Sequence, residues 1–284
     1  MSAAPPVPAN TNSARNSHFR TLLGSSTAIV GGAIAATVAF SVGAASHSLP
    51  VMGGGPLVVA LVVAAIAWLK ADSDAEGEFF RRYAAVHAMH YWPKWSLNEF
   101  TPLLGGGDRR RCEHWMEANG RGLGWYTFEV RQENGDQADT WESHDFTVAT
   151  VDIGEHGMSR FQGVYLRRRR GVFDRLNGGA NWLAGHHLEK VELESAAFMD
   201  RFELWTSRDQ DEIVLRQLFA PSFVVWLSDH PLRPGFELRA GVLVVFIPEH
   251  CGQAGKLEFL QMAAAEISKR IWAELTEAAQ AGSV

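Results

Sequence analysis

The chain has 284 residues, a formal net charge of −6 and only two cysteines, Cys112 and Cys251. Two cysteines exclude a disulfide-stabilised secreted scaffold, and the acidic balance argues against a nucleic-acid partner. The acidic side chains all follow residue 69, so residues 70–284 carry 24 basic and 32 acidic side chains, a net charge of −8. We therefore expect an N-terminal segment of different character, followed by an acidic domain.

The N-terminal segment holds two uncharged apolar runs, residues 28–45 and 51–69. Each has 18 or 19 residues, about the length that a helix needs to cross a bilayer. Backbone amides inside lipid require internal partners, which favours helices. The sequence predicts a flexible tail over residues 1–27 and a transmembrane helical hairpin over residues 28–69.

Small side chains recur every fourth residue in the first run, which places them on one helical face. This spacing allows close backbone packing in a membrane. The residues are Gly31, Ala35, Ala39 and Gly43. We expect them to pack against the second helix of the hairpin.

Basic residues flank the predicted hairpin and are absent from its connecting loop. Arg15 and Arg20 precede the first run, and Lys70, Arg81 and Arg82 follow the second. Because basic residues stay on the cytoplasmic side, we expect both termini to be cytoplasmic, with the protein in the inner (plasma) membrane.

Two other interpretations of these runs remain open. The first run is compatible with a signal peptide cleaved near Ala44 and Ala45. The Gly-rich start of the second run is compatible with a buried hairpin in a soluble core.

The soluble part is predicted to begin with a helix capped near Asp72 to Asp74. Side chains then recur at helical spacing: Phe79, Tyr83, Val86 and His90. The glycines at 105–107 interrupt this pattern. Residues 70–104 are therefore predicted as a connecting helix and linker, and residues 105–284 as an α+β domain.

Alternating hydrophobic residues in that domain predict a mostly antiparallel sheet. The expected strands are Trp125–Val130, Phe146–Ile153, Phe161–Leu166, Val191–Leu193, Glu203–Thr206, Glu212–Leu218 and Gly241–Ile247. Asn134-Gly135 predicts a hairpin turn. The expected helices are Ala197–Phe202, one starting at Pro221, and Leu257–Leu275.

The region from residue 191 to 246 resembles a bacterial family of unknown function. Its members are two-helix membrane proteins often encoded beside LemA-like proteins. The resemblance is carried by Glu192-Leu193-Glu194-Ser195, Phe198, Phe202, Leu204, Asp209, Leu215, Leu218, Ala220-Pro221, Phe223, Trp226-Leu227, Phe236 and the strand Val242–Ile247, with Phe161 and Gly163 before it. Ala220 departs from the Ser or Thr that the family places before the proline. The resemblance implies an anchored cytoplasmic α+β domain and brings no catalytic residues. Because such proteins are often encoded beside LemA-like proteins, a LemA-like protein is the candidate partner.

Histidines offer one candidate metal site. On a single helix, His87 and His90 lie three residues apart and share a face, so both imidazoles reach one ion. His114 or Glu113 is the candidate third ligand. The competing interpretation is that the pair lines a contact between the helix and the sheet. No cofactor is predicted.

Three short sequences bear on other chemistry. Cys251 follows His250, but neighbours along a strand point to opposite sides, which disfavours an activated thiolate. His186 and His187 lie in a Gly/Asn-rich stretch and are expected to be solvated. The triplet Arg109–Arg111 after three glycines lacks the Gly-Lys-Ser/Thr end of a phosphate-binding loop.

The run Arg167, Arg168, Arg169 and Arg170 is the sharpest charge feature. It is a candidate surface for anionic headgroups or an acidic partner. Alternation along a strand would divide it between two faces.

No catalytic motif is evident, so the expected function is a membrane-anchored interaction or scaffold module that binds the bilayer and a membrane or peripheral protein. The exposed sheet edge and the groove beside the Pro221 helix are its candidate surfaces. The alternative is an enzyme acting on a lipid or envelope metabolite, with the His87 and His90 region as its metal site. A transporter subunit is disfavoured because neither apolar run holds an ionisable group.

Overall fold

The computed structural model describes residues 10–11, 70, 73–132, 139–169 and 188–281. Within these ranges, no helix is both long and apolar enough to cross a bilayer. The predicted hairpin over residues 28–69, with Gly31, Ala35, Ala39 and Gly43, lies outside them, as does the predicted turn at Asn134-Gly135.

The chain divides into two compact units. One comprises residues 1–87 with 252–254, and the other comprises residues 88–251 with 255–284. In the described part of the first unit, residues 73–86 form a helix and Asn10 forms a bridge with Gln253.

The helix over residues 73–86 ends earlier than the sequence predicted. Phe79 and Tyr83 are buried as expected, and the Phe79 ring meets the neighbouring ring of Phe80 edge-to-face at 5.0 Å. The helix ends at residue 86, however, and Val86 is exposed. Ala88 adopts a positive φ of 52°, and the chain then enters a strand at His90. The prediction that the helical stripe continues to His90 is therefore wrong.

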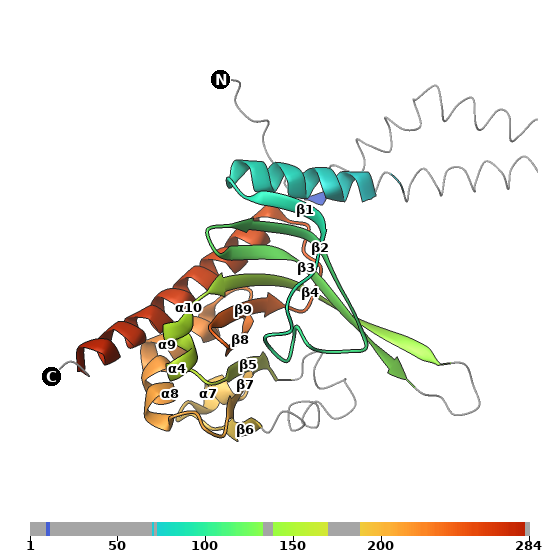
Figure 1. The fold of residues 1–284 in the computed structure, drawn as a ribbon. Coiled ribbons are helices and arrows are strands. Elements are labelled where there is room, and N and C mark those ends of the chain that lie inside the picture. The colour runs from blue at the N-terminus through green and yellow to red at the C-terminus, as the bar shows by residue number, and fades with distance from the viewer. Residues whose placement is uncertain (1–9, 12–69, 71–72, 133–138, 170–187, 282–284) are drawn as a thin grey trace, which may run out of the picture. The chain divides into compact units, whose positions relative to one another are not determined.

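The described residues of the second unit form a sheet of nine strands with flanking helices, which confirms the α+β class (Figure 1). All pairings are antiparallel, and the spatial order is β1-β2-β3-β4-β9-β8-β5-β7-β6. The strands are β1 (His90–Trp95), β2 (Arg109–Ala118), β3 (Arg121–Gln132), β4 (Thr140–Asp152), β5 (Val164–Arg168), β6 (Leu188–Val191), β7 (Phe202–Ser207), β8 (Gly235–Arg239) and β9 (Val242–Ile247).

The helices that the structure describes in this unit are mostly short. They are α4 (Glu155–Arg160), α7 (Ala196–Met199), α8 (Glu212–Leu218), α9 (Pro221–Asp229) and the long α10 (Ala254–Ala281). The apolar stripe predicted for the last helix is buried: Leu257, Leu260, Ala264, Ile267, Ile271 and Leu275. A continuous buried stripe of this kind is typical of a helix that packs on the core with one face.

The segment Glu212–Leu218 is a helix, so the predicted strand there is wrong. The side chain of Asp211 accepts a hydrogen bond from the amide of Ile213 and caps the first turn. Val214, Leu215 and Leu218 then bury one face. The apolar residues of this segment do not alternate, and the spacing of Val214, Leu215 and Leu218 fits one face of a helix.

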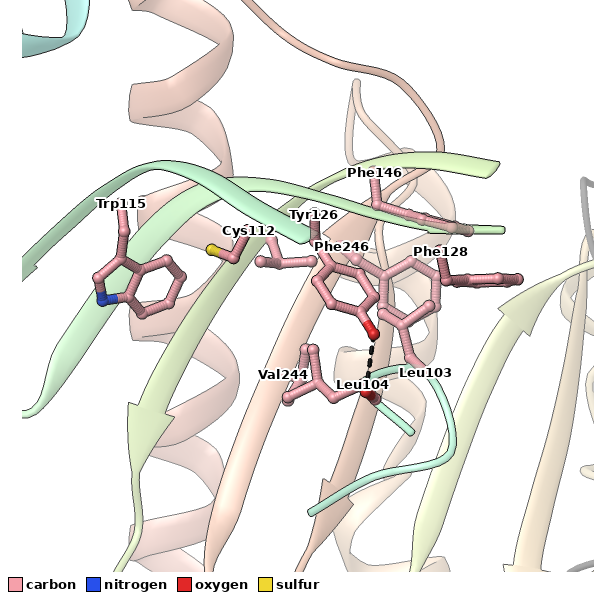
Figure 2. Close-up of a cluster of buried hydrophobic side chains, with 10 residues drawn as sticks. Leu103, Leu104, Cys112, Trp115, Tyr126, Phe128, Phe146, Val244 and Phe246 are labelled. Carbon is pink, nitrogen blue, oxygen red and sulfur yellow. Dashed lines mark hydrogen bonds between the residues drawn. The ribbon is translucent and has the colours of Figure 1, made fainter. Parts of the chain in front are cut away.

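The loop between β1 and β2 packs into the core over the sheet. Leu103 and Leu104 are buried with aromatic side chains of β2, β3, β4 and β9 (Figure 2). The hydroxyl of Tyr126 donates to the carbonyl of Leu104 at 2.7 Å, and the amide of Leu103 donates to Oε2 of Glu237 at 2.7 Å. These bonds attach the loop, so the Gly-rich stretch behind it is a turn into β2 and not a free linker.

Candidate functional site

The groove predicted beside the Pro221 helix is present in the second unit. It is a cavity of about 350 Å³ between α9, the end of α8 and the segment before α7. Its lining residues are Leu193, Glu194, Ser195, Arg216, Phe219, Pro221, Val224 and Val225. An apolar hollow with a few polar groups at its margin is the usual form of a binding site.

Pro221 starts the helix that forms one wall of this groove. Proline suits the first helical turn, where its missing N–H leaves no bond unmade. Ala220 provides no capping side chain, but its carbonyl accepts hydrogen bonds from the amides of Phe223 (2.8 Å) and Val224 (3.1 Å). The chain therefore turns into α9 through backbone contacts alone.

Aromatic packing supports the floor of the groove. The ring of Phe219 lies 5.7 Å from Phe223, 6.0 Å from Phe236 and 6.3 Å from Phe198. Aromatic rings at such separations pack favourably. The floor is thus tied to the sheet through Phe236 of β8.

The outer rim presents apolar surface to solvent. Val225 is 58% exposed, whereas Val224 and Leu227 on the same helix are buried. Ile213 on α8 is 69% exposed but does not line the groove. The groove therefore has an exposed aliphatic side chain at its edge, Val225, which we call its lip. Ile213 is a comparably exposed aliphatic residue outside the groove.

An ion pair borders the groove at the end of α8. Arg216 contacts Glu212 at 2.8 Å and approaches Glu194 at 3.9 Å. Hydrogen bonding to the Glu212 carboxylate raises the pKa of Arg216. The hydroxyl of Ser195 caps α7 by accepting from the Phe198 amide. These groups form no nucleophile–base arrangement.

The arginine run is divided between different environments. Arg167 is buried and pairs with the buried Glu237, while Arg168 donates to the carbonyls of Leu232 and Arg233. Arg169 is exposed and lies 3.8 Å from Asp200. Arg170 lies outside the described residues. The run therefore does not form one cationic surface along β5.

Burial lowers the pKa of Arg167, and the carboxylate of Glu237 opposes that shift. The same carboxylate accepts from the Leu103 amide, so the arginine, the glutamate and the loop form one buried polar network. The guanidinium of Arg167 has a structural role in this network.

His87 and His90 do not share a helical face. His87 follows the helix of residues 73–86, and its ring packs on Tyr83 at 4.3 Å. His90 begins β1, and its ring packs on Trp92 at 4.4 Å. Among the side chains that the structure places, no three His, Cys, Asp or Glu residues gather as a metal site requires. The shared-face geometry behind the metal hypothesis is therefore wrong.

His114 instead belongs to an aromatic cluster on the sheet. Its Nδ1 lies 2.9 Å from the Tyr91 hydroxyl, and its ring meets Trp125 edge-on at 5.0 Å. The ring of His250 stacks on Trp125 at 4.6 Å. Burial, with a smaller contribution from His250, lowers the pKa of His114 to about 4. Burial also lowers the pKa of His250.

The surroundings of His250 do not form a catalytic triad. Its Nε2 lies 3.0 Å from Oγ1 of Thr127 and 3.6 Å from Oδ1 of Asp145. Hydroxyl and carboxylate thus meet the same imidazole nitrogen, whereas a relay requires them on opposite nitrogens. Cys251 is buried, and its carbonyl accepts from the indole of Trp125 at 2.9 Å. His186 and His187 lie outside the described residues.

Comparisons with known proteins give one structural neighbour. The chain is similar to the crystal structure of the mycobacterial trehalose monomycolate transport factor A, TtfA, at 9% sequence identity. The similarity covers 69% of this chain and 94% of that chain, with a TM-score of 0.44. No protein-family model matches the sequence, and no curated protein matches it. At this identity the neighbour assigns no role to any side chain described above.

Proposed function

We propose that this protein is an interaction module anchored in the inner membrane, with its α+β domain in the cytoplasm. The apolar runs over residues 28–69 support the anchor. A tethered domain meets membrane proteins at a raised local concentration, which favours docking by a small surface.

The groove beside α9 is the observation that carries the proposal. It combines an aliphatic lip at Val225, an aromatic floor at Phe219 and a charged margin at Arg216. Apolar anchors that fill such a hollow dominate the binding energy of protein interfaces, and polar groups at the rim fix orientation. The occupant is an apolar side chain or short segment of a membrane or peripheral protein. The family resemblance suggests a LemA-like partner.

Site-specific photocrosslinking tests this assignment. A photoreactive residue at position 225 in native membranes is expected to yield one adduct, identified by mass spectrometry. The same residue at position 213, which is exposed but outside the groove, is expected to yield none. Equal labelling from both positions contradicts a specific groove.

Charge introduced at the lip provides a second test. Val225→Glu is expected to abolish recovery of that partner, because it places a carboxylate where an apolar side chain docks. Ile213→Glu adds the same charge on α8 and is expected to leave recovery unchanged. Loss of the partner in both variants would point to a general electrostatic effect.

The anchor is tested separately. The full chain is expected to resist carbonate extraction from membrane vesicles, and deletion of residues 28–69 is expected to release it. Release of the full chain by carbonate contradicts the anchor and leaves the groove assignment to its own tests.

A further inference from the structure

A second groove lies on the sheet, away from α9. It has a volume of about 460 Å³ and shares no lining residue with the groove beside α9. The residues around it come from the end of β1 and the loop after it, from β2, β3 and the turn between them, from β4 and α4, and from the β8–β9 turn with the start of β9. Its size is within the usual range for a small-molecule site.

Glycines of β3 shape the floor of this groove. The indole of Trp115 lies over them, and a Cβ atom at Gly122 would stand 2.0 Å from its Cζ2. At Gly124 a Cβ atom would stand 2.8 Å from its Cε3. The absence of side chains at these two glycines lets the flat indole ring lie against β3 and form the floor. Its Nε1 donates to Oε2 of Glu117 at 3.1 Å.

Large apolar side chains around the hollow remain open to solvent. Trp95 is 40% exposed, and Phe100 and Met158 are exposed to a similar degree. Single exposed apolar residues are ordinary, but several around one hollow mark a binding surface. Trp95 and Phe100 are also aromatic residues of the lining, and the π faces of aromatic rings attract cations.

The charged side chains that line the groove are both acidic. Oε2 of Glu117 accepts from the Trp115 indole, and Oδ1 of Asp152 accepts from the Gly154 amide at 2.8 Å. Each carboxylate is therefore oriented by a donor of the protein. The described lining includes no lysine or arginine, so an anion entering the groove meets like charge and a cation meets opposite charge.

We propose that this groove binds a small organic cation that carries an apolar body. Its ammonium group lies against the carboxylates of Glu117 and Asp152 and the π face of Trp95. Its apolar part covers Trp115, Phe100 and Met158. The site is independent of partner docking beside α9.

A charge series of one scaffold tests the proposal on the full chain in zwitterionic nanodiscs, with empty nanodiscs as the blank. The probes are 3-phenylpropylamine, 3-phenylpropan-1-ol and 3-phenylpropionate, and binding is measured by calorimetry. The amine is expected to bind about tenfold more tightly than the alcohol, because a cation–π contact and the two carboxylates both favour the ammonium group, and the propionate is expected not to saturate. Equal affinity of amine and alcohol, or no saturable binding of the amine, overturns the proposal.

Variants locate the binding. Asp152→Asn keeps an acceptor for the Gly154 amide but removes the charge, and Trp95→Ala removes the π face. Each is expected to weaken binding of the amine about three- to tenfold. Trp272→Ala alters a tryptophan of similar exposure (42%) on α10, outside the groove, and is expected to leave binding unchanged. Weakening by Trp272→Ala as large as that by Trp95→Ala places the probe elsewhere and overturns the assignment.

Discussion

The core beneath the β1–β2 loop and the rim of the groove beside α9 use the same charged residue types in opposite ways. In the core, Arg167 and Glu237 are both buried, and the carboxylate also accepts from the loop backbone. At the rim, Arg216 and Glu212 are both exposed and pair within one helical turn. Burial turns an ion pair into part of the architecture, whereas water screens the exposed pair and leaves it free to rearrange around a partner.

The largest expected effect comes from breaking the buried pair. Glu237→Ala leaves the guanidinium of Arg167 buried without its carboxylate and removes the acceptor for the Leu103 amide. We expect the free energy of unfolding to fall by about 3–5 kcal/mol in denaturant titrations. Glu212→Ala is the matched control and is expected to leave stability nearly unchanged. Similar losses in both variants would remove the contrast between core and rim.

Acidification is expected to destabilise the protein through its partly buried histidines, which extends the comparison of buried and exposed charge. The folded-state pKa of His114 lies at about 4, below its ordinary value of 6.5, because burial disfavours the charged imidazolium. The unfolded state therefore binds more protons between these values, and stability is lost as the pH falls from 6.5 towards 4. His250, whose pKa burial also lowers, acts in the same direction.

The variant His114→Asn isolates the contribution of His114. Asparagine tolerates the positive φ of 53° at this position, so the backbone is retained. We expect its unfolding free energy to depend less steeply on pH between 6.5 and 4. An unchanged slope would exclude His114 as a source of the acid sensitivity.

Overpacking the sheet is expected to have an intermediate effect. In Gly122→Ala the new methyl group overlaps the Trp115 ring, so the indole or the strand must shift. We expect a loss of about 1–3 kcal/mol in thermal or chemical unfolding. Gly255→Ala, where a Cβ atom meets nothing within 4 Å, is the control and is expected not to destabilise the protein. An unaffected Gly122→Ala variant would mean that the floor of the second groove is pliable.

The smallest effect is expected at the cap of α8, beside the rim. Asp211→Ala removes the acceptor for the Ile213 amide and is expected to cost about 1 kcal/mol. Because α8 carries Arg216, the same variant is expected to weaken partner recovery as well. Asp209→Ala, two residues before the cap, is the control. A loss of partner without a loss of stability would separate the rim from the helix that holds it.

Regular patterns in the sequence were sufficient for part of this fold. The stripe of α10 repeats at helical spacing, and the predicted strand Phe146–Ile153 lies within β4 except for its last residue. The run Gly241–Ile247 is apolar without alternation, as expected of a covered central strand, and residues 243–247 of β9 are all buried. The first turn of α9 was predicted from Pro221, and with it the groove. The segment Glu212–Leu218 was predicted as a strand because the capping role of Asp211 was not recognised. The short run of apolar residues does not by itself distinguish a strand from a helix, whereas the cap favours the helix.

Other parts depend on contacts between distant residues. The register between β2 and β3 shifts between Glu113 and Met116, and this bulge disrupts the alternation that marks a strand. The second groove gathers side chains as far apart as Trp95 and Val242, and no spacing along the chain connects them. The burial of Arg167 likewise depends on a glutamate 70 residues away.

The two outer strands among those described restrict how a partner can attach. Pro93 lies in β1 and offers no amide hydrogen, and Lys94 follows it with a positive charge. At the opposite side, β6 spans only four residues and places Glu189 and Lys190 at its centre. Such margins discourage another polypeptide from extending the sheet, and they equally discourage fibre-like self-association. Recognition by this domain is therefore expected to proceed through side chains in its hollows, and a high concentration of copies is not expected to make them aggregate.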